Sequence, residues 1–406
     1  MEEKYIELLL EKCIDKQSKI LFIHYQKEID NFIQKLIKKA KDKGISEIYL
    51  DCEDIYKTHS LLKESTEKSI LESKYFDSSI WDEYAKKNAS FLIMETEYPN
   101  LMEDIPDNLI ALAAKRKRET RPIYRKMVEK CTLSWCIAAY PGKEWAKSVF
   151  NNEENSEEKL KQAIFTTCML EKENPLDCWD NHLNKIQKLM NVLNHLNLTK
   201  LHYQNSLGTS LDVYLPKNYQ FSSAKDQKVI VNMPSYEVFA SPDYRKTEGI
   251  VYNAKPLYYN GKKVDEFWIK FVEGRAVDYD AKVGKEILKA IIEGDDTSCY
   301  LGECALVEYN SPISNLNITF GTTLIDENAS CHLALGAGFA ECLKDGLNTS
   351  KEELTKQGIN SSKIHVDFMI GTSDLSIIAT TDQNKEVVIF ENGNFSKEIN
   401  EKANQC

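Results

Sequence analysis

The sequence predicts an α/β N-terminal domain built on a parallel, doubly wound sheet, followed by an α+β domain rich in antiparallel strands. The chain has 406 residues, which is more than one ordinary core accommodates and therefore favours two domains. Strand and helix patterns alternate through the first half of the chain. In the second half, short stretches typical of β-strands dominate, and residues typical of turns separate them. We therefore expect one domain over 1–197 and a second over 198–406.

The first half repeats a strand followed by a helix. In 28–43, for example, Ile29, Phe32 and Ile33 recur at helical spacing, and Gly44 is suited to ending that helix. Strands are expected at 19–25, 47–52, 89–95 and 132–140, and helices at 5–13, 54–65, 155–170 and 177–196. The stretch 107–130 is expected to be mostly helical. This alternation is typical of parallel sheets, because a parallel pair needs a crossover connection that is usually a helix.

Strands dominate the second half. The turn Tyr259-Asn-Gly-Lys262 predicts a hairpin, because Asn-Gly supplies the positive φ angles of a type I′ turn. Strands are expected at 200–204, 210–215, 228–232, across 249–280, at 300–307 and across 365–395, and helices at 283–293 and 328–343.

Charge and composition disfavour several classes of function. The net charge is -11, from 63 acidic and 52 basic residues, which argues against binding nucleic acid because that needs Lys and Arg to neutralise phosphates. The basic run 115–118 is interpreted as a solvated helix face.

The acidic start and the short apolar runs predict neither a secretion signal nor a membrane span, so we expect a cytoplasmic protein with reduced thiols. No Gly-rich phosphate loop follows the early strands, which disfavours nucleotide binding.

Two histidines have carboxylates close by in the sequence. On a strand, His365 and Asp367 point to the same side, so their donor atoms can converge on one ion or on two adjacent ions. An exposed polar pair is the alternative interpretation. Glu327 and His332 are five residues apart, about 140° around a helix, so they would converge only if Glu327 lay in a loop before a helix carrying His332. A capped helix start with a chance histidine is the alternative there.

Two further carboxylates have apolar surroundings. Glu303 lies in a strand pattern whose other residues look buried, and burying an unpaired carboxylate is costly. A metal ion would satisfy it, as would an arginine or backbone donors. Glu237 follows the apolar run 229–233 at a strand end, a common place for functional residues. Together these carboxylates and imidazoles suit Zn²⁺, Co²⁺ or Mn²⁺, and they resemble the oxygen-rich ligand sets of two-metal hydrolases.

Several longer segments form recognisable motifs. They are Met233-Pro-Ser-Tyr-Glu-Val-Phe-Ala-Ser-Pro-Asp243, Thr247-Glu-Gly-Ile250, Leu301-Gly-Glu-Cys-Ala-Leu-Val307, Asp326-Glu-Asn-Ala-Ser-Cys-His332 and His365-Val-Asp-Phe-Met-Ile-Gly371, with 138–141, 145–147 and 208–213 upstream. These motifs resemble the thermophilic aminopeptidase family, the aminopeptidase T, aminopeptidase S and PepS group of metallopeptidases. The resemblance spans nearly the whole chain and is most specific in the C-terminal half.

This resemblance implies a dinuclear metal site and a hydrolase. Its metal ligands would be Glu237, Glu303, His332, His365 and Asp367, with Glu303 bridging, and Glu327 would be a further ligand or a proton acceptor. Two divalent ions are implied, Zn²⁺ or Co²⁺, with Mn²⁺ or Mg²⁺ as alternatives.

The family resemblance also implies an activity. Family members are intracellular homodimers that remove single N-terminal residues from peptides. The expected reaction is hydrolysis by water activated at the two metals, with Glu327 or Glu237 accepting its proton.

The sequence departs from the family at one position of the site. Phe339, in Gly336-Ala-Gly-Phe339, stands where the family usually has a tyrosine, so a phenolic hydrogen-bond donor is lost. This leaves two alternatives to an ordinary aminopeptidase. One is a weakly active or non-catalytic metal-binding homologue, and the other is a two-metal hydrolase acting on another amide or ester.

Overall fold

The computed structural model describes residues 1–151, 153–223, 228–259 and 261–405. Spatial contacts divide the chain into two units, one of 1–176 with 227–233 and one of 177–226 with 234–406. Most of helix α10 (Pro175–His195) therefore groups with the second unit. The domain boundary after residue 197 stays a prediction. No helix in the described ranges combines the length and the apolar character needed to cross a membrane.

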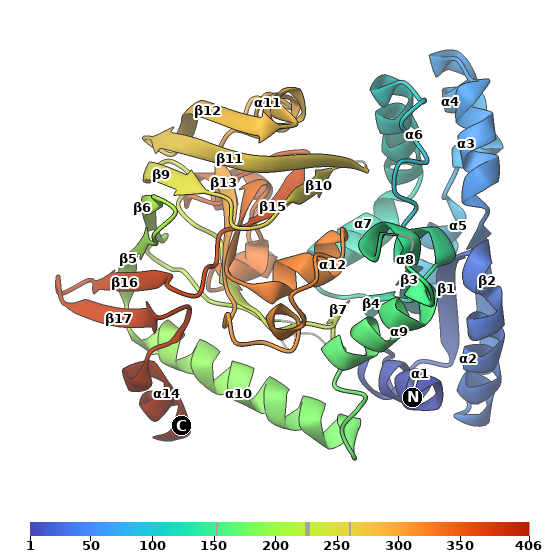
Figure 1. Ribbon diagram of the computed structural model, residues 1–406, viewed down its shortest axis with the longest axis horizontal. Coiled ribbons are helices and arrows are strands. Elements are labelled where there is room, and N and C mark those ends of the chain that lie inside the picture. The colour runs from blue at the N-terminus through green and yellow to red at the C-terminus, as the bar shows by residue number, and fades with distance from the viewer. Residues whose placement is uncertain (152, 224–227, 260, 406) are drawn as a thin grey trace. The chain divides into compact units, whose positions relative to one another are not determined.

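The first unit is built on a parallel sheet with strand order β2-β1-β3-β4-β7 (Figure 1). The expected parallel sheet of the N-terminal part is therefore confirmed. Its strands are β1 (Ile20–Gln26), β2 (Glu47–Glu53), β3 (Ser90–Glu95), β4 (Trp135–Ala139) and β7 (Asn232–Met233). The strand expected at 228–232 thus contributes only the short β7.

Nine α-helices belong to the described part of this unit: α1 (Glu2–Lys12), α2 (Asp30–Asp42), α3 (Ile55–Lys63), α4 (Glu67–Glu72), α5 (Ile80–Lys86), α6 (Asp107–Glu119), α7 (Pro122–Glu129), α8 (Lys143–Val149) and α9 (Ser156–Thr167). The mostly helical structure expected over 107–130 is confirmed, and it is divided between α6 and α7. Proline disfavours helical backbone at the residue before it, and Arg121 accordingly has φ -126° and ψ 55°. Pro122 then starts α7, where its missing N–H costs nothing.

The second unit contains a large antiparallel sheet with order β10-β11-β9-β6-β5-β16-β17-β18, and β12 pairs with β11. Its strands are β5 (Leu198–Gln204), β6 (Ser210–Tyr214), β9 (Glu248–Tyr252), β10 (Leu257–Tyr259), β11 (Lys262–Val272), β12 (Arg275–Val283), β16 (Ser376–Thr381), β17 (Glu386–Glu391) and β18 (Asn394–Phe395). Tyr259 pairs with Lys262, as expected for the predicted hairpin. Asn260 of the predicted turn lies outside the described residues.

A second antiparallel sheet has the order β15-β14-β13-β8, from β8 (Val238–Ala240), β13 (Leu301–Leu306), β14 (His332–Gly336) and β15 (His365–Met369). The helix expected over 328–343 is wrong. Helix α12 (Thr323–Asp326) and a 3-10 turn, η5 (Glu327–Ala329), end before His332, and β14 then pairs on both sides. A central strand is buried on both faces, so its apolar run resembles that of a buried helix.

Three α-helices complete the described part of the second unit: α11 (Lys285–Ile292), α13 (Lys351–Lys356) and α14 (Lys397–Gln405). Helix α11 matches the helix expected over 283–293.

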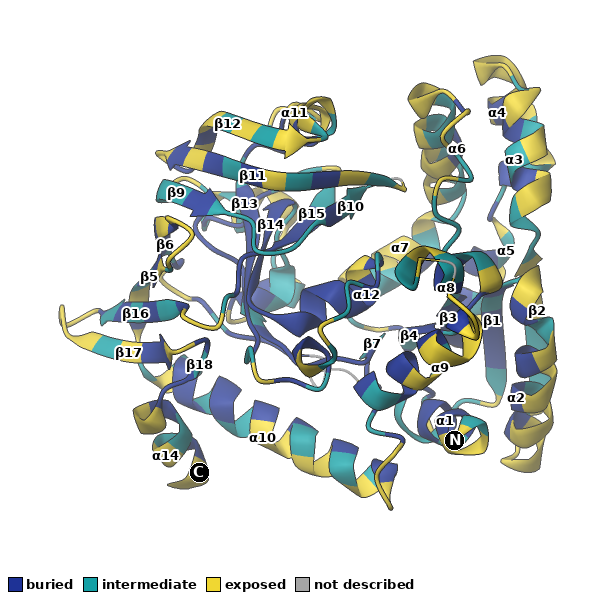
Figure 2. Cartoon of the chain, in the orientation of Figure 1, coloured by how far each residue is buried: buried dark blue, intermediate teal, exposed yellow. Residues whose placement is uncertain are grey.

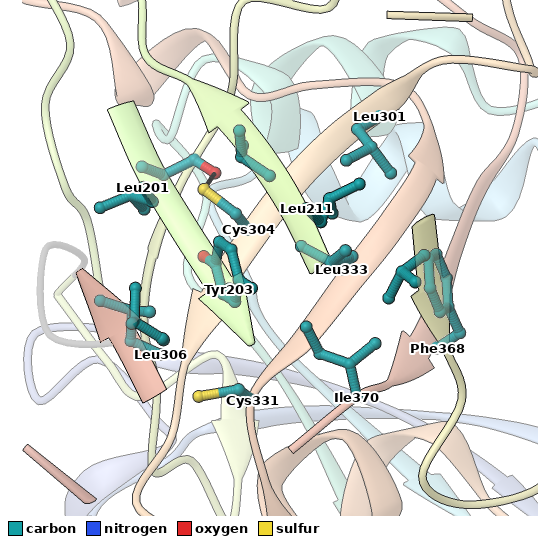
Figure 3. Close-up of a cluster of buried hydrophobic side chains, with 14 of the residues drawn as sticks. Leu201, Tyr203, Leu211, Leu301, Cys304, Leu306, Cys331, Leu333, Phe368 and Ile370 are labelled. Carbon is teal, nitrogen blue, oxygen red and sulfur yellow. Dashed lines mark hydrogen bonds between the residues drawn. The ribbon is translucent and has the colours of Figure 1, made fainter. Parts of the chain in front are cut away.

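One side of this second sheet packs into the main hydrophobic core of the unit. Figure 2 shows β13 and β14 as buried, and Figure 3 shows their side chains against β5 and β6. Every second residue of each strand contributes to this core. Examples are Cys304 and Leu306 of β13, Leu333 of β14 and Phe368 of β15, which face Leu201 and Tyr203 of β5 and Leu211 of β6. Because side chains alternate, the intervening residues of β13, β14 and β15 share the other side of the sheet. That side carries the candidate site.

Candidate metal centre

The register of the second sheet gathers the sequence-predicted residues on one side. Glu303 of β13 pairs with Ala334 of β14, and Ala334 pairs in turn with Asp367 of β15. His332 begins β14 two residues before Ala334, and His365 begins β15 two residues before Asp367, so both imidazoles share this side. Glu237 directly precedes β8, which pairs with β13. Residues far apart in the sequence therefore meet.

These residues form two triads that share Glu303. In one, Glu237, Glu303 and His332 have donor atoms within 4.8 Å of one another, and in the other Glu303, His365 and Asp367 do. His332 Nε2 lies 3.2 Å from Glu237 Oε2 and 4.0 Å from Glu303 Oε1. His365 Nε2 lies 3.0 Å from Glu303 Oε2 and 3.2 Å from Asp367 Oδ1. The two oxygens of Glu303 thus face different histidines.

Backbone carbonyls orient both imidazole rings. His365 Nδ1 donates to the Ala337 carbonyl at 2.7 Å, and His332 Nδ1 donates to the Ser330 carbonyl at 3.3 Å. In each ring this leaves Nε2 facing the carboxylates. A metal-binding histidine is commonly held in this way by its other nitrogen.

Glu327 lies beside the triads but belongs to neither. It is 8% exposed and sits in η5, while His332 sits on β14 rather than on the helix expected from the sequence. Burial raises its pKa well above the usual value, and the charges of Asp367 and Glu237 raise it further. Its carboxyl group is therefore close to the cluster and favours the protonated form when no cation is bound.

The carboxylates and imidazoles of the triads perturb one another strongly. Burial raises the pKa of Glu303 to about 7, although His365 opposes the shift. Burial lowers the pKa of His332, but its hydrogen bond with Glu237 and the surrounding carboxylate charges together raise the pKa to about 10. Burial likewise lowers the pKa of His365, but Asp367 and Glu303 together raise it well above its usual value. In the metal-free cluster, the imidazoles hold protons that compensate the acidic groups.

The donor set fits divalent metal ions. Four buried carboxyl groups, those of Glu237, Glu303, Glu327 and Asp367, face two imidazoles, and such mixed oxygen and nitrogen sets suit Zn²⁺ or Co²⁺. Asp367 Oδ1 is buried, and although His365 Nε2 lies 3.2 Å away, it makes no hydrogen bond of good geometry with the described residues. An oxygen in this condition is costly unless a cation or donor compensates it.

Three neighbours of the centre were missed by the sequence reasoning. Asn328 is fully buried, accepts a hydrogen bond from the Tyr236 backbone N–H at 2.7 Å and donates to Glu327 Oε1 at 3.4 Å. His182 of α10 donates to the Ser235 carbonyl at 3.0 Å and so fixes the segment before Glu237. Asn328 lies in a polar stretch that the sequence suggested as a capped helix start rather than as a contact of Glu327, whereas His182 and Tyr236 had no local signal.

Comparison with known proteins identifies the family. Residues 1–395 match the model of the thermophilic metalloprotease (M29) family. The chain is 33% identical over 400 residues to aminopeptidase AmpS of Bacillus subtilis (strain 168), covering 97% of both chains. It is also 33% identical over 403 residues to aminopeptidase PepS of Streptococcus thermophilus, again covering 97% of both.

A solved structure agrees with these relatives. Wild-type AmpT from Thermus thermophilus superposes with a TM-score of 0.88 at 25% identity, covering 97% of this chain and 98% of that one. The fold class expected from the sequence is therefore confirmed, and so is the expectation of a metallo-aminopeptidase enzyme. The chain belongs to the thermophilic metalloprotease (M29) family.

Proposed function

We propose that this protein removes single residues from the free N-termini of peptides, using two divalent cations held by the two triads. Glu237 and His332 would hold one cation, His365 and Asp367 the other, and Glu303 would bridge them. The observation that carries the proposal is that each oxygen of Glu303 faces a different histidine, at 4.0 and 3.0 Å. Zn²⁺ or Co²⁺ fits this donor set, with Mn²⁺ or Mg²⁺ as alternatives.

The protein groups have separate tasks in this reaction. When bound, the two cations would polarise the scissile carbonyl and lower the pKa of water, which is the usual contribution of two-metal sites. Glu237 is committed to His332 within one triad, whereas Glu327 belongs to neither. Glu327 is therefore the better candidate to accept the proton of the attacking water and pass it to the leaving amine. The acidic cluster would attract the substrate's α-ammonium group and so favour the N-terminal bond.

The proposal is tested by an assay on short peptides. Purified protein supplied with Co²⁺ or Zn²⁺ should release the first residue from a series of unblocked dipeptides and leave their N-acetylated counterparts intact. Cleavage of ester or other amide substrates without peptide cleavage would favour the alternative of a different two-metal hydrolase. The family resemblance also supports a cytoplasmic homodimer, and sedimentation analysis would test the dimer.

Metal binding should release protons. At neutral pH the raised pKa values of His332, to about 10, and of His365 keep both imidazoles protonated in the metal-free protein, but only neutral imidazole binds metal. We expect about three protons released per protein at pH 7, one from each imidazole and one from Glu327, with a further fraction from Glu303, whose pKa is about 7. The affinity should rise with pH through the neutral range. Calorimetric titration of Zn²⁺ in buffers of different ionisation enthalpy measures this number. A value near zero would contradict the expected protonation.

Phe339 bears on how active the enzyme is. Its ring lies 4.8 Å from that of His365 and 5.4 Å from that of Phe239, so the side chain borders the second triad. We expect Phe339→Tyr to raise kcat about 10- to 100-fold by adding a donor at a site of developing negative charge, with KM changed much less. Steady-state kinetics on one dipeptide would measure both. An unchanged kcat would show that the missing phenol does not limit this enzyme.

A further inference from the structure

The first unit contains a cavity of about 510 Å³ that none of the candidate metal ligands lines. His24, Asp51, Ile93 and Ile137 occupy matched register positions on β1, β2, β3 and β4, so their side chains share one side of the parallel sheet and line the cavity. The strand order reverses between β1 and β3. Ligands of open α/β sheets commonly bind at such a reversal, and this volume is typical of small-molecule sites.

Two acidic groups of the cavity, Asp51 and Glu53, already have partners. Asp51 Oδ2 lies 2.9 Å from His24 Nδ1 and accepts a hydrogen bond from Trp81 Nε1 at 3.0 Å. Glu53 Oε1 accepts hydrogen bonds from Lys117 Nζ at 2.8 Å and from a threonine hydroxyl at 3.0 Å. These pairs hold one wall of the cavity in place. The carboxyl group of Glu95 also lines the cavity, and burial raises its pKa to about 8, so it is mostly uncharged at neutral pH. None of these three acids therefore calls for a cationic ligand.

Arg121 also lines the cavity and, unlike Asp51 and Glu53, makes no ion pair with any residue that the structure describes. Its guanidinium lies 4.1 Å from the centroid of the Trp81 ring and 5.4 Å from that of Tyr124. Within the described ranges, its guanidinium has no ion pair or hydrogen bond, and its buried Nε has no partner. Burial lowers the pKa of Arg121, whereas the charges of Tyr124 and Asp51 act in the opposite direction and raise it. An unpaired cation thus faces a cavity with aromatic walls.

Backbone structure fixes this arginine in place. It is the N-cap residue of α7, directly before Pro122. The carboxylate of Asp82 accepts hydrogen bonds from the backbone N–H groups of Ile123 at 3.1 Å and Tyr124 at 2.8 Å. The backbone at the start of α7 is therefore anchored, and the packing of the guanidinium on the Trp81 ring holds it beside the cavity. Preorganisation of this kind favours a specific binding site over a mobile surface charge.

We propose that this cavity binds a small organic carboxylate with an apolar or aromatic body, whose carboxylate pairs with Arg121. A guanidinium matches a carboxylate in a two-point hydrogen-bonded pair. Trp81, Tyr124 and Trp135 provide apolar contact area for the body of the ligand. The nearby carboxylates of Asp51 and Glu53 disfavour a multiply charged anion such as phosphate.

Calorimetry on the full-length, metal-loaded protein tests the ligand class. The probes are 3-phenylpropionate, phenethylamine, which lacks the carboxylate, and inorganic phosphate, which lacks the apolar body. We expect saturable binding of 3-phenylpropionate and at least about 10-fold weaker binding of the other two. No saturable binding of 3-phenylpropionate, or equal binding of phosphate, would overturn the proposal.

Variants locate the site. Arg121→Gln should weaken 3-phenylpropionate binding at least about 10-fold, whereas Arg118→Gln, an exposed arginine of α6, should leave it unchanged. Ile137→Phe reduces the cavity volume while retaining Arg121, so it should also weaken binding and covers the case in which Arg121→Gln misfolds. Circular dichroism checks the fold of each variant. Unchanged affinity in either folded variant would place the carboxylate elsewhere, for example at the metal centre, and would refute the assignment.

Discussion

Replacing Glu303 with alanine should lower kcat/KM for dipeptide hydrolysis at least about 1,000-fold and reduce the bound metal, because both proposed cations lose a ligand at once. Glu303 is 4% exposed, and its two oxygens face His332 and His365. The fold should persist, because burial disfavours the ionised form of Glu303 and the substitution removes that cost, which offsets the lost hydrogen bond with His365. Kinetics and elemental analysis measure the two effects.

The matched control is Glu353→Ala on α13, an exposed glutamate of the same unit. It should keep both activity and metal content near those of the unmodified protein. If Glu303→Ala retained most of its activity while circular dichroism showed an intact fold, Glu303 could not be the bridging group and the proposed centre would be wrong.

Glu327→Gln should lower kcat about 100- to 10,000-fold while the metal content stays close to that of the unmodified protein. The amide preserves the shape of the side chain but cannot accept a proton from water. This separates proton transfer from metal binding, because Glu327 belongs to neither triad. Steady-state kinetics with elemental analysis at one pH provides the comparison. Loss of metal in parallel with activity would instead make Glu327 a ligand.

Asp326, the acidic residue next to Glu327, provides a comparison for the Glu327→Gln variant. Asp326 accepts hydrogen bonds from the backbone N–H groups of Phe320 at 2.9 Å and Gly321 at 2.7 Å, so its role is to hold the loop before α12. Asp326→Asn should lower the melting temperature, because an amide has one acceptor oxygen where the carboxylate uses two. We expect its kcat to fall much less than that of Glu327→Gln. A similar loss in both variants would point to damage to the loop rather than to proton transfer.

The sequence predicted the N-terminal sheet well because each strand there is followed by a helix with clear periodicity, as for β1 and α2. It failed at β14, where an apolar run in the middle of a sheet has no alternation to distinguish it from a buried helix. The mostly helical character of 107–130 was predicted, but not the position of the break at Arg121, where one proline divides the stretch into α6 and α7.

The candidate site could be predicted only in part from local sequence patterns. His365 and Asp367 could be paired from strand alternation alone. Their approach to Glu303, Glu237 and His332 depends on the pairing of β15, β14, β13 and β8, which joins segments far apart in the sequence, and family resemblance was needed to gather them. The cavity beside Arg121 left no local motif, because its walls come from four strands and from the junction of two helices.

The most direct test of the proposed centre is anomalous diffraction from crystals grown with Zn²⁺. We predict two peaks about 3.5–4 Å apart, one at Glu237 and His332, the other at His365 and Asp367, with Glu303 reaching both. Peaks that avoid these side chains, or a single peak at full occupancy that leaves one triad without metal, would contradict the account.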